Sequence, residues 1–216
     1  MRFEVIDCEQ HSEAWYAARA GRVTGSRAAD MLAKIKSGEA AGRRDYRAQL
    51  VVETLTGQTD DETRFFSKDM QRGIEHEPVA RGLYEALTGR LVRQTGFLAM
   101  TEIRAGCSLD GDVEDFQTLV GIKCPKAATH LEYLKGLRLP PKYVPQATHE
   151  MWVTGAEHYD FCSYNERFPE KLQFFLVRIE RAEFPLAGHE VEVKRFLAEV
   201  DAEVATLRNL KLPWAA

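Results

Sequence analysis

The sequence lacks long hydrophobic runs, closely spaced cysteines and an excess of positive charge. No stretch approaches the roughly 20 apolar residues of a transmembrane helix, and no charged-then-apolar leader opens the chain, so we expect a cytoplasmic protein without membrane contact. Cys8, Cys107, Cys124 and Cys162 form no Cys-x-x-Cys pair, which argues against a zinc or iron–sulfur site. The formal net charge of −4 excludes non-specific coating of nucleic acid, so any such contact must be local.

The chain is long enough to form a hydrophobic core of its own. With 216 residues, 44% hydrophobic and 29% charged, it is predicted to be a single domain over 1–216. We expect a helical N-terminal part over about 1–88, a sheet-centred core over about 89–180 and a C-terminal helix over about 184–210. This order indicates an α/β (α+β) fold.

Local patterns predict the individual elements. Helices are expected at 11–20, 26–34, 45–56, 68–87, 127–135, 143–153 and 190–210. Ser26 is the expected N-cap of the second helix, and Thr-Gly pairs should close the third and fourth. Strands are expected at 90–99, 103–108 and 118–124, as a three-stranded meander, and at 158–164 and 172–179.

The stretch SLDGDVEDFQTLVGIKCP, residues 108–125, carries the clearest chemical pattern. Residues two apart in a strand share a face, so positions 121 and 123 project together, and Asp110 can reach that face from a neighbouring strand. Two carboxylates there would hold Mg²⁺ through their oxygens, while a lysine would position a water or stabilise the charge that grows on a phosphodiester during hydrolysis. One carboxylate is missing, because position 121 is glycine. On this motif alone, a turn aspartate and a solvated strand-end lysine remain the alternative.

Three further motifs extend the pattern. WYAARAGRVTGS, RGIEHEPVARGLYE and YVPQATHEMWVTG, together with SLDG…GIKCP, span residues 15–155. In this order they resemble the lambda-exonuclease-like (YqaJ-type) viral recombinase family of PD-(D/E)xK nucleases. The resemblance implies a restriction-endonuclease-like core, with a central mixed sheet flanked by helices.

The same resemblance implies an activity and its partners. The expected protein is a processive 5′-to-3′ exonuclease of phage or prophage origin that acts on linear double-stranded DNA in the cytoplasm of a bacterial host cell and leaves 3′ single strands for recombination. It would require Mg²⁺, with Mn²⁺ as an alternative, and would form a homotrimer ring around DNA. A single-strand annealing protein is the implied partner.

The resemblance also assigns roles to single residues. Asp110 matches the metal-binding aspartate, Lys123 the catalytic lysine, Ile122 the residue whose carbonyl contacts the metal, Glu77 a helix glutamate near the metals, and Gln146 a glutamine close to the site. Gly121 occupies the position of the second metal-binding carboxylate.

Arg19 and Ser26 match residues that bind a terminal 5′-phosphate. An arginine fork and a hydroxyl at a helix start suit such a group, although a solvated arginine and an ordinary cap would give the same pattern. Arg43, Arg44 and Arg47 are candidates for backbone contacts in a DNA channel, or else form a solvated face.

Gly121 separates the functional hypotheses. The first is the exonuclease, weakened or inactive because Gly121 replaces the glutamate; the second is a DNA-end-binding protein of the same fold that does not cleave. A cysteine-cluster nuclease is a third, which the scattered cysteines disfavour. Asp112 and Glu114 are the nearest substitute carboxylates. Gly121→Glu should restore Mg²⁺-dependent digestion.

Overall fold

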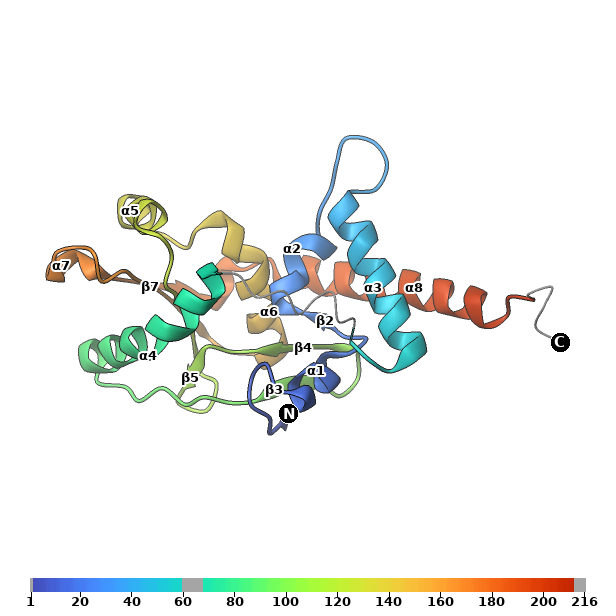
Figure 1. The fold of residues 1–216 in the computed structure, drawn as a ribbon, viewed down its shortest axis with the longest axis horizontal. Helices are drawn as coiled ribbons and strands as arrows, with labels where there is room; N and C mark the ends of the chain where they lie inside the picture. Colours follow the sequence, from blue (N-terminus) through green and yellow to red (C-terminus); the bar gives the residue numbers. More distant parts are fainter. Residues whose placement is uncertain (1, 60–67, 212–216) are drawn as a thin grey trace.

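The structure is a computed structural model that describes residues 2–59 and 68–211 (Figure 1). Its helices are α1 (Glu13–Arg19), α2 (Ala28–Met31), α3 (Ala41–Thr56), α4 (Lys68–Thr88), α5 (Ala127–Gly136), α6 (Val144–Thr154), α7 (Glu170–Gln173) and α8 (Leu186–Arg208), with 3₁₀ turns η1 (Gly25–Arg27), η3 (Pro141–Tyr143) and η4 (Arg181–Glu183). Its strands are β1 (Phe3–Ile6), β2 (Val23–Thr24), β3 (Phe97–Met100), β4 (Ala105–Ser108), β5 (Gly111–Val113), β6 (Thr118–Lys123), β7 (His158–Tyr164) and β8 (Phe174–Glu180).

The strands form two four-stranded mixed sheets, in the orders β1-β3-β4-β2 and β5-β6-β7-β8. In the second sheet, β6 pairs antiparallel with β5 and parallel with β7. A parallel pair needs a long crossover, and here α5 and α6 provide it. The mixed sheet with flanking helices is thus confirmed, although two sheets replace the single one that was expected.

The predicted three-stranded meander is wrong. β3 and β4 pair antiparallel in the first sheet, whereas β6 belongs to the second and pairs with β5, a three-residue strand that the sequence did not predict. Only Leu109 and Asp110 separate β4 from β5, so the chain passes from one sheet to the other at this point. Residues 90–96 contribute only an isolated bridge, between Arg93 and Asp112.

The structure contains the predicted helices, but several of their first and last residues differ from the prediction. The segments expected at 127–135 and 143–153 are α5 and α6, and the strand at 158–164 is β7. α3 and α4 end at glycines in the left-handed conformation, with φ of +72° at Gly57 and +69° at Gly89, as the Thr-Gly pairs predicted. Ser26 is not an N-cap, because it lies inside η1, and the cap position of α2 is Arg27. The helical N-terminal part also contains β1 and β2.

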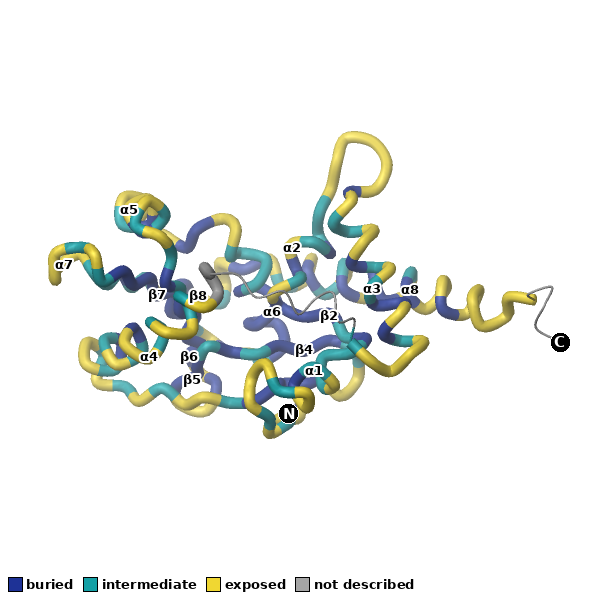
Figure 2. The backbone as a smooth tube through the Cα atoms, in the orientation of Figure 1, coloured by how far each residue is buried: buried dark blue, intermediate teal, exposed yellow. Residues whose placement is uncertain are grey.

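The core lies where α6 and α8 cover the sheets. All seven residues from Ala147 to Val153 on α6 are buried, and Figure 2 shows this buried stretch beside the buried strands. On α8 the buried apolar residues recur at helical spacing: Val193, Phe196, Leu197, Val200 and Val204. Each such side chain contributes roughly 1.5–3 kcal/mol by leaving water. Because α6 is so extensively buried, the side chains that it directs towards β6 are held in defined positions.

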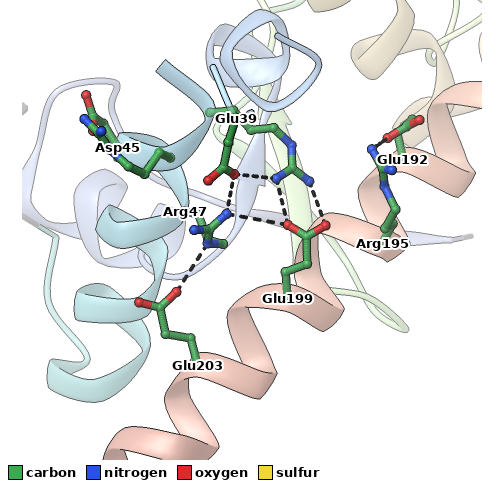
Figure 3. A network of polar contacts seen from close by, with 9 residues as sticks. Glu39, Asp45, Arg47, Glu192, Arg195, Glu199 and Glu203 are labelled. Carbon is green, nitrogen blue, oxygen red and sulfur yellow. Dashed lines mark hydrogen bonds and ion pairs between the residues drawn. The ribbon is translucent and has the colours of Figure 1, made fainter. Parts of the chain in front are cut away.

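An ion-pair network fastens α3 to α8 (Figure 3). Arg43 donates to both carboxylate oxygens of Glu199, at 2.7 and 2.9 Å, and Arg47 donates to Glu203 at 3.2 Å. Both arginines also contact Glu39, in the segment before α3. Their guanidinium groups are therefore engaged within the molecule, which disfavours both alternatives for Arg43 and Arg47, contacts in a DNA channel and a solvated face. Across 2–59 and 68–211, no helix is long and apolar enough to cross a membrane.

Candidate functional site

The site is built at the end of β6. This strand ends at Lys123, and Pro125, which has no N–H to donate to a ladder, follows one residue later. Leu119, Gly121 and Lys123 alternate with Val120 and Ile122, so the first three point to the face of the sheet that α6 covers.

Asp110 lies beside the end of β6, on the edge that faces β5 and beyond Val120, the last residue of β6 that pairs with β5. Its Oδ2 accepts a hydrogen bond from the Ile122 N–H at 2.7 Å and another from Lys123 Nζ at 3.0 Å. In a strand, the N–H and C=O of one residue point to the same neighbour, so the Ile122 carbonyl also points to the Asp110 side. Asp110, the Ile122 carbonyl and Lys123 are therefore brought together, as the sequence predicted.

These groups face an open cleft of about 480 Å³. Asp110, Ile122 and Lys123 line it from the sheet, and Glu77 lines it from α4, while Glu75, two residues earlier, does not. Cationic side chains also line the cleft: Arg72, Lys126 and Lys142. The cleft thus combines an acidic centre with basic walls, which suits a phosphate chain and a bridging cation.

Two carboxylates oppose one another across this cleft. Burial, followed by the negative charge of Asp110, raises the pKa of Glu77, while Arg81 and Lys123 act in the opposite direction. The Glu77 carboxylate also accepts a hydrogen bond from Arg81. A divalent cation bound by oxygen ligands would relieve the repulsion between Glu77 and Asp110, so the donor set fits Mg²⁺. Among the described residues, however, no three His, Cys, Asp or Glu side chains are grouped closely enough to hold an ion by themselves.

Lys123 is held as an ammonium group. Burial disfavours its charge, but Asp110 and then Glu150 outweigh burial and raise the pKa of Lys123 above its ordinary value. Its side chain is 22% exposed, and that of Asp110 is 21% exposed. The ammonium group can therefore still reach the cleft, where it can donate to a phosphate oxygen or orient a water.

Arg19, Thr24 and Ser26 form a polar cluster next to this cleft, the Arg19 pocket. Arg19 Nη2 donates to Ser26 Oγ at 3.2 Å and to Thr24 Oγ1 at 3.4 Å, and its guanidinium stacks 4.1 Å from the Trp15 ring centre. Across 2–59 and 68–211, no carboxylate forms an ion pair with Arg19. An oriented cation without an acidic partner, beside a serine hydroxyl, is suited to an anion.

Two contacts connect the Arg19 pocket to the cleft. Trp15 Nε1 donates to Ser108 Oγ at 2.7 Å, and Ser108 lies two residues before Asp110. His11 lines the cleft, and its pKa is lowered first by burial and then by the charge of Arg19. The pocket and the cleft are therefore neighbouring parts of one surface.

Comparison with protein families identifies the family of this chain. The model of the YqaJ-like viral recombinase domain matches residues 14–157, which include Arg19, Glu77, Asp110 and Lys123. The chain belongs to the YqaJ-like viral recombinase family. Members of this family act on DNA. No curated protein matches the chain.

Solved structures support the same assignment. The chain is 41% identical to LHK-Exo, an alkaline exonuclease from Laribacter hongkongensis, with a TM-score of 0.81; the alignment covers 91% of this chain and 96% of that one. LHK-Exo in complex with dAMP matches with the same identity and coverage and a TM-score of 0.82. A phage-related exonuclease from Haemophilus somnus 129PT shares the fold, at 15% identity and a TM-score of 0.63 over 86% of this chain and 94% of that one. The close match to an alkaline exonuclease supports a nuclease role.

The structure gives a local reason for Gly121, which the sequence alone did not. Tyr159 pairs in register with Leu119 on the neighbouring strand, so its ring crosses the same face of the sheet as Gly121. A Cβ added at Gly121 would lie 2.2 Å from the Tyr159 hydroxyl and 2.8 Å from its Cζ. The Tyr159 side chain is only 2% exposed and cannot simply turn into solvent. This clash argues against the expectation that Gly121→Glu alone restores digestion.

Glu150, on α6, is a functional candidate that the sequence analysis missed. Its Oε1 accepts a hydrogen bond from Gln146 Nε2 at 2.8 Å, and its Oε2 accepts one from the Tyr159 hydroxyl at 3.1 Å. Burial, followed by the charge of Asp110, raises the pKa of Glu150 to about 7, against the effect of Lys123. Gln146 thus acts on this carboxylate and does not line the cleft. The i, i+4 spacing of Gln146 and Glu150 in an otherwise buried helix was the available signal.

The two substitute carboxylates suggested by the sequence lie elsewhere. Asp112 is fully buried and accepts two hydrogen bonds from Arg93, at 2.8 and 3.2 Å. Glu114 is exposed in the turn after β5, where its φ is +55° and its nearest cation is Arg90 at 3.7 Å. Asp112 is engaged by Arg93 and Glu114 lies in an exposed turn, so neither residue takes the place of a carboxylate at position 121.

Proposed function

We propose that this protein is a Mg²⁺-dependent 5′-to-3′ exonuclease that digests linear double-stranded DNA processively and leaves 3′ single strands for recombination. Its partners would be DNA ends, two further copies of the chain in a homotrimer ring, and a single-strand annealing protein. The observation that carries the proposal is the ion pair of Lys123 with Asp110, which faces Glu77 across a cleft with basic walls.

Asp110, Glu77 and the Ile122 carbonyl are the groups that would hold Mg²⁺, with Mn²⁺ as a substitute. When bound, the cation would polarise the scissile phosphate and lower the pKa of a bound water. Lys123 can only donate hydrogen bonds, because it is held as an ammonium group, so its role is to stabilise negative charge on the phosphate or to orient the attacking water. Arg72, Lys126 and Lys142 would hold the strand along the cleft.

The Arg19 pocket supports the proposed direction of digestion. A chain that begins degradation at a 5′ end must place the terminal phosphate close to the hydrolytic groups, and the pocket adjoins the cleft through Trp15 and His11. LHK-Exo was crystallised with dAMP, a nucleoside monophosphate of the kind that such digestion would release.

Substitution of Arg19 tests the phosphate pocket. We expect the protein to prefer a 5′-phosphorylated end over a 5′-hydroxyl end, because a charge-assisted contact is worth roughly 1.5–3 kcal/mol, or about 10- to 100-fold. Arg19→Ala should remove most of that preference. Arg27→Ala is the control, because Arg27 is a half-buried arginine at the end of η1 that pairs with Asp30, and initial rates on the two DNA ends are the measurement. A preference that survives in Arg19→Ala would remove Arg19 from this role.

The assembly provides another test. An acidic chain cannot rely on its overall charge to stay on DNA, so processivity requires that it enclose the duplex, and a closed cyclic trimer supplies that topology. Native mass spectrometry at micromolar concentration and physiological salt should find three chains. A monomer under these conditions would contradict both the ring and the processivity.

Gly121 is expected to weaken the enzyme. Mg²⁺ is held by few protein carboxylates, so a missing one lowers both the occupancy and the precision of the site. Digestion should therefore be slower and need more Mg²⁺ than in a chain with a carboxylate on β6. A DNA-end-binding protein that does not cleave is the alternative, which the bulky Tyr159 at the position of the missing side chain favours.

Digestion of end-labelled DNA separates these two functions. A linear duplex labelled at the 5′ end should release labelled mononucleotide first in the presence of Mg²⁺, and none in the presence of a chelator. The same duplex labelled at its 3′ end should release its label late. Binding of DNA ends without any nucleotide release at high Mg²⁺ would replace the exonuclease with the end-binding function.

A further inference from the structure

Glu150 is a buried acid whose hydrogen-bond partners are both neutral. Its side chain is 4% exposed, and no cation among the described residues forms an ion pair with it. Two other buried acids, Asp112 and Asp160, are paired with Arg93 and Arg178, whereas Glu53 is buried with neutral donors, as Glu150 is. A buried charge without a counter-charge is costly, and Glu150 differs from Glu53 because it lies beside Gly121.

The location of Glu150 corresponds to the carboxylate that β6 lacks. The Tyr159 hydroxyl lies 2.2 Å from the place of a Cβ at Gly121, and the same hydroxyl donates to Glu150 Oε2 at 3.1 Å. The Glu150 carboxylate is thus close to the space where a side chain at position 121 would start, although Glu150 itself does not line the cleft. It approaches from α6, on the face of the sheet to which Gly121 and Lys123 point.

Glu150 interacts electrostatically with the charged residues of the site, Asp110 and Lys123. Asp110 and Glu150 repel one another, and Lys123 attracts both. Gly25 adjoins this carboxylate, because a Cβ added there would lie 3.4 Å from both Glu150 Cγ and Oε1, in ordinary van der Waals contact. Gly25 directly precedes Ser26 of the Arg19 pocket, so α6 lies between that pocket and the end of β6.

We propose that Glu150 supplies the carboxylate that β6 lacks at Gly121, and that it joins Asp110 as a ligand of the divalent cation. The inference rests on the proposed function for the cation itself. Gln146 and Tyr159 are positioning residues, which hold the two oxygens of Glu150 from opposite sides. The metal-binding carboxylate has in this chain moved from a strand to the helix that covers it.

Mn²⁺ binding to the full-length protein without DNA, measured by titration calorimetry, tests the inference. Glu150→Gln keeps the shape of the side chain and removes its charge, and it should lower Mn²⁺ affinity about 10-fold or more, as Asp110→Asn should. Glu150→Asp keeps the charge but shortens the side chain, so its loss should be smaller. Glu53→Gln is the matched control, because Glu53 is also buried and held by neutral donors, Gly21 and Gln49, and it should not change the affinity.

The outcomes separate the inference from the proposed function. Unchanged Mn²⁺ affinity in Glu150→Gln, together with a loss in Asp110→Asn, would overturn the role of Glu150 and leave the exonuclease standing. Affinity that depends on Glu150 without release of nucleotides from DNA would support the inference and overturn the exonuclease. Should Glu150→Gln fail to fold, Glu150→Asp is the deciding variant. If both Glu150→Asp and Glu53→Gln bind Mn²⁺ with wild-type affinity, the length of the side chain at 150 does not matter, and Glu150 is not a ligand of the cation.

Discussion

Lys123→Ala is expected to lower the rate of nucleotide release from linear duplex DNA about 10³-fold at saturating Mg²⁺. The ammonium group is held by Asp110 at 3.0 Å, beside the position where charge must develop on the phosphate. Removal of one such preorganised donor costs about 4 kcal/mol of transition-state stabilisation, which is about 10³ in rate. Affinity for DNA ends should change little, because Arg19 and the basic walls of the cleft remain. Single-turnover digestion and end binding, measured on the same duplex, separate the two quantities.

Lys126→Ala is the matched control for this result. Lys126 is an exposed lysine that lines the same cleft, three residues after Lys123, at the N-cap of α5. Its loss should weaken binding and change the maximal rate only a few-fold. A Lys123→Ala protein that digests DNA at the rate of Lys126→Ala would show that Lys123 acts as a binding cation and not in the chemical step.

The sequence predicted best the elements whose signals are local. The capped helix α3 and the alternating strand β7 follow from their own residues, and the Asp110–Lys123 pair follows from strand periodicity together with the family motifs. The division into two sheets was not predictable in this way. It depends on β1 pairing with β3, more than 90 residues later, and on the three-residue strand β5, which has too few residues to show a period.

Charge patterns were the least informative part of the sequence. Arg43 and Arg47 look like a solvated or DNA-binding run, but their partners Glu199 and Glu203 lie on α8, 156 residues away in each case. Glu150 was hidden for the same reason: its partner Tyr159 is on another element, and only the fold brings the two to Gly121. Side chains that are neighbours across elements leave little trace in one sequence, whereas neighbours along a helix or strand leave a period.

Gly121→Glu is expected to destabilise the protein without restoring fast digestion. The new Cβ would overlap the Tyr159 hydroxyl at 2.2 Å, and the new carboxylate would be placed beside Glu150 and Asp110. Overpacking of this kind costs roughly 1–3 kcal/mol, which for a chain of this size lowers Tm by roughly 2 to 12 °C. Gly121→Ala is the control, because it carries the clash without the charge, and it should also lower Tm. A Gly121→Ala protein as stable as the wild type would refute the clash.

Removal of the Tyr159 ring should leave space for a glutamate side chain at position 121 of β6. In Gly121→Glu/Tyr159→Ala the new side chain has the space of the ring, so the loss of stability should be smaller than the sum of the two single losses by about 0.5–3 kcal/mol. Mn²⁺ affinity in the double variant should then depend on the carboxylate at 121, and an added Glu150→Gln should lower it far less than in the wild-type background. If Glu150→Gln costs the same affinity in both backgrounds, the two carboxylates do not substitute for each other, and Glu150 acts on the cation from a position of its own.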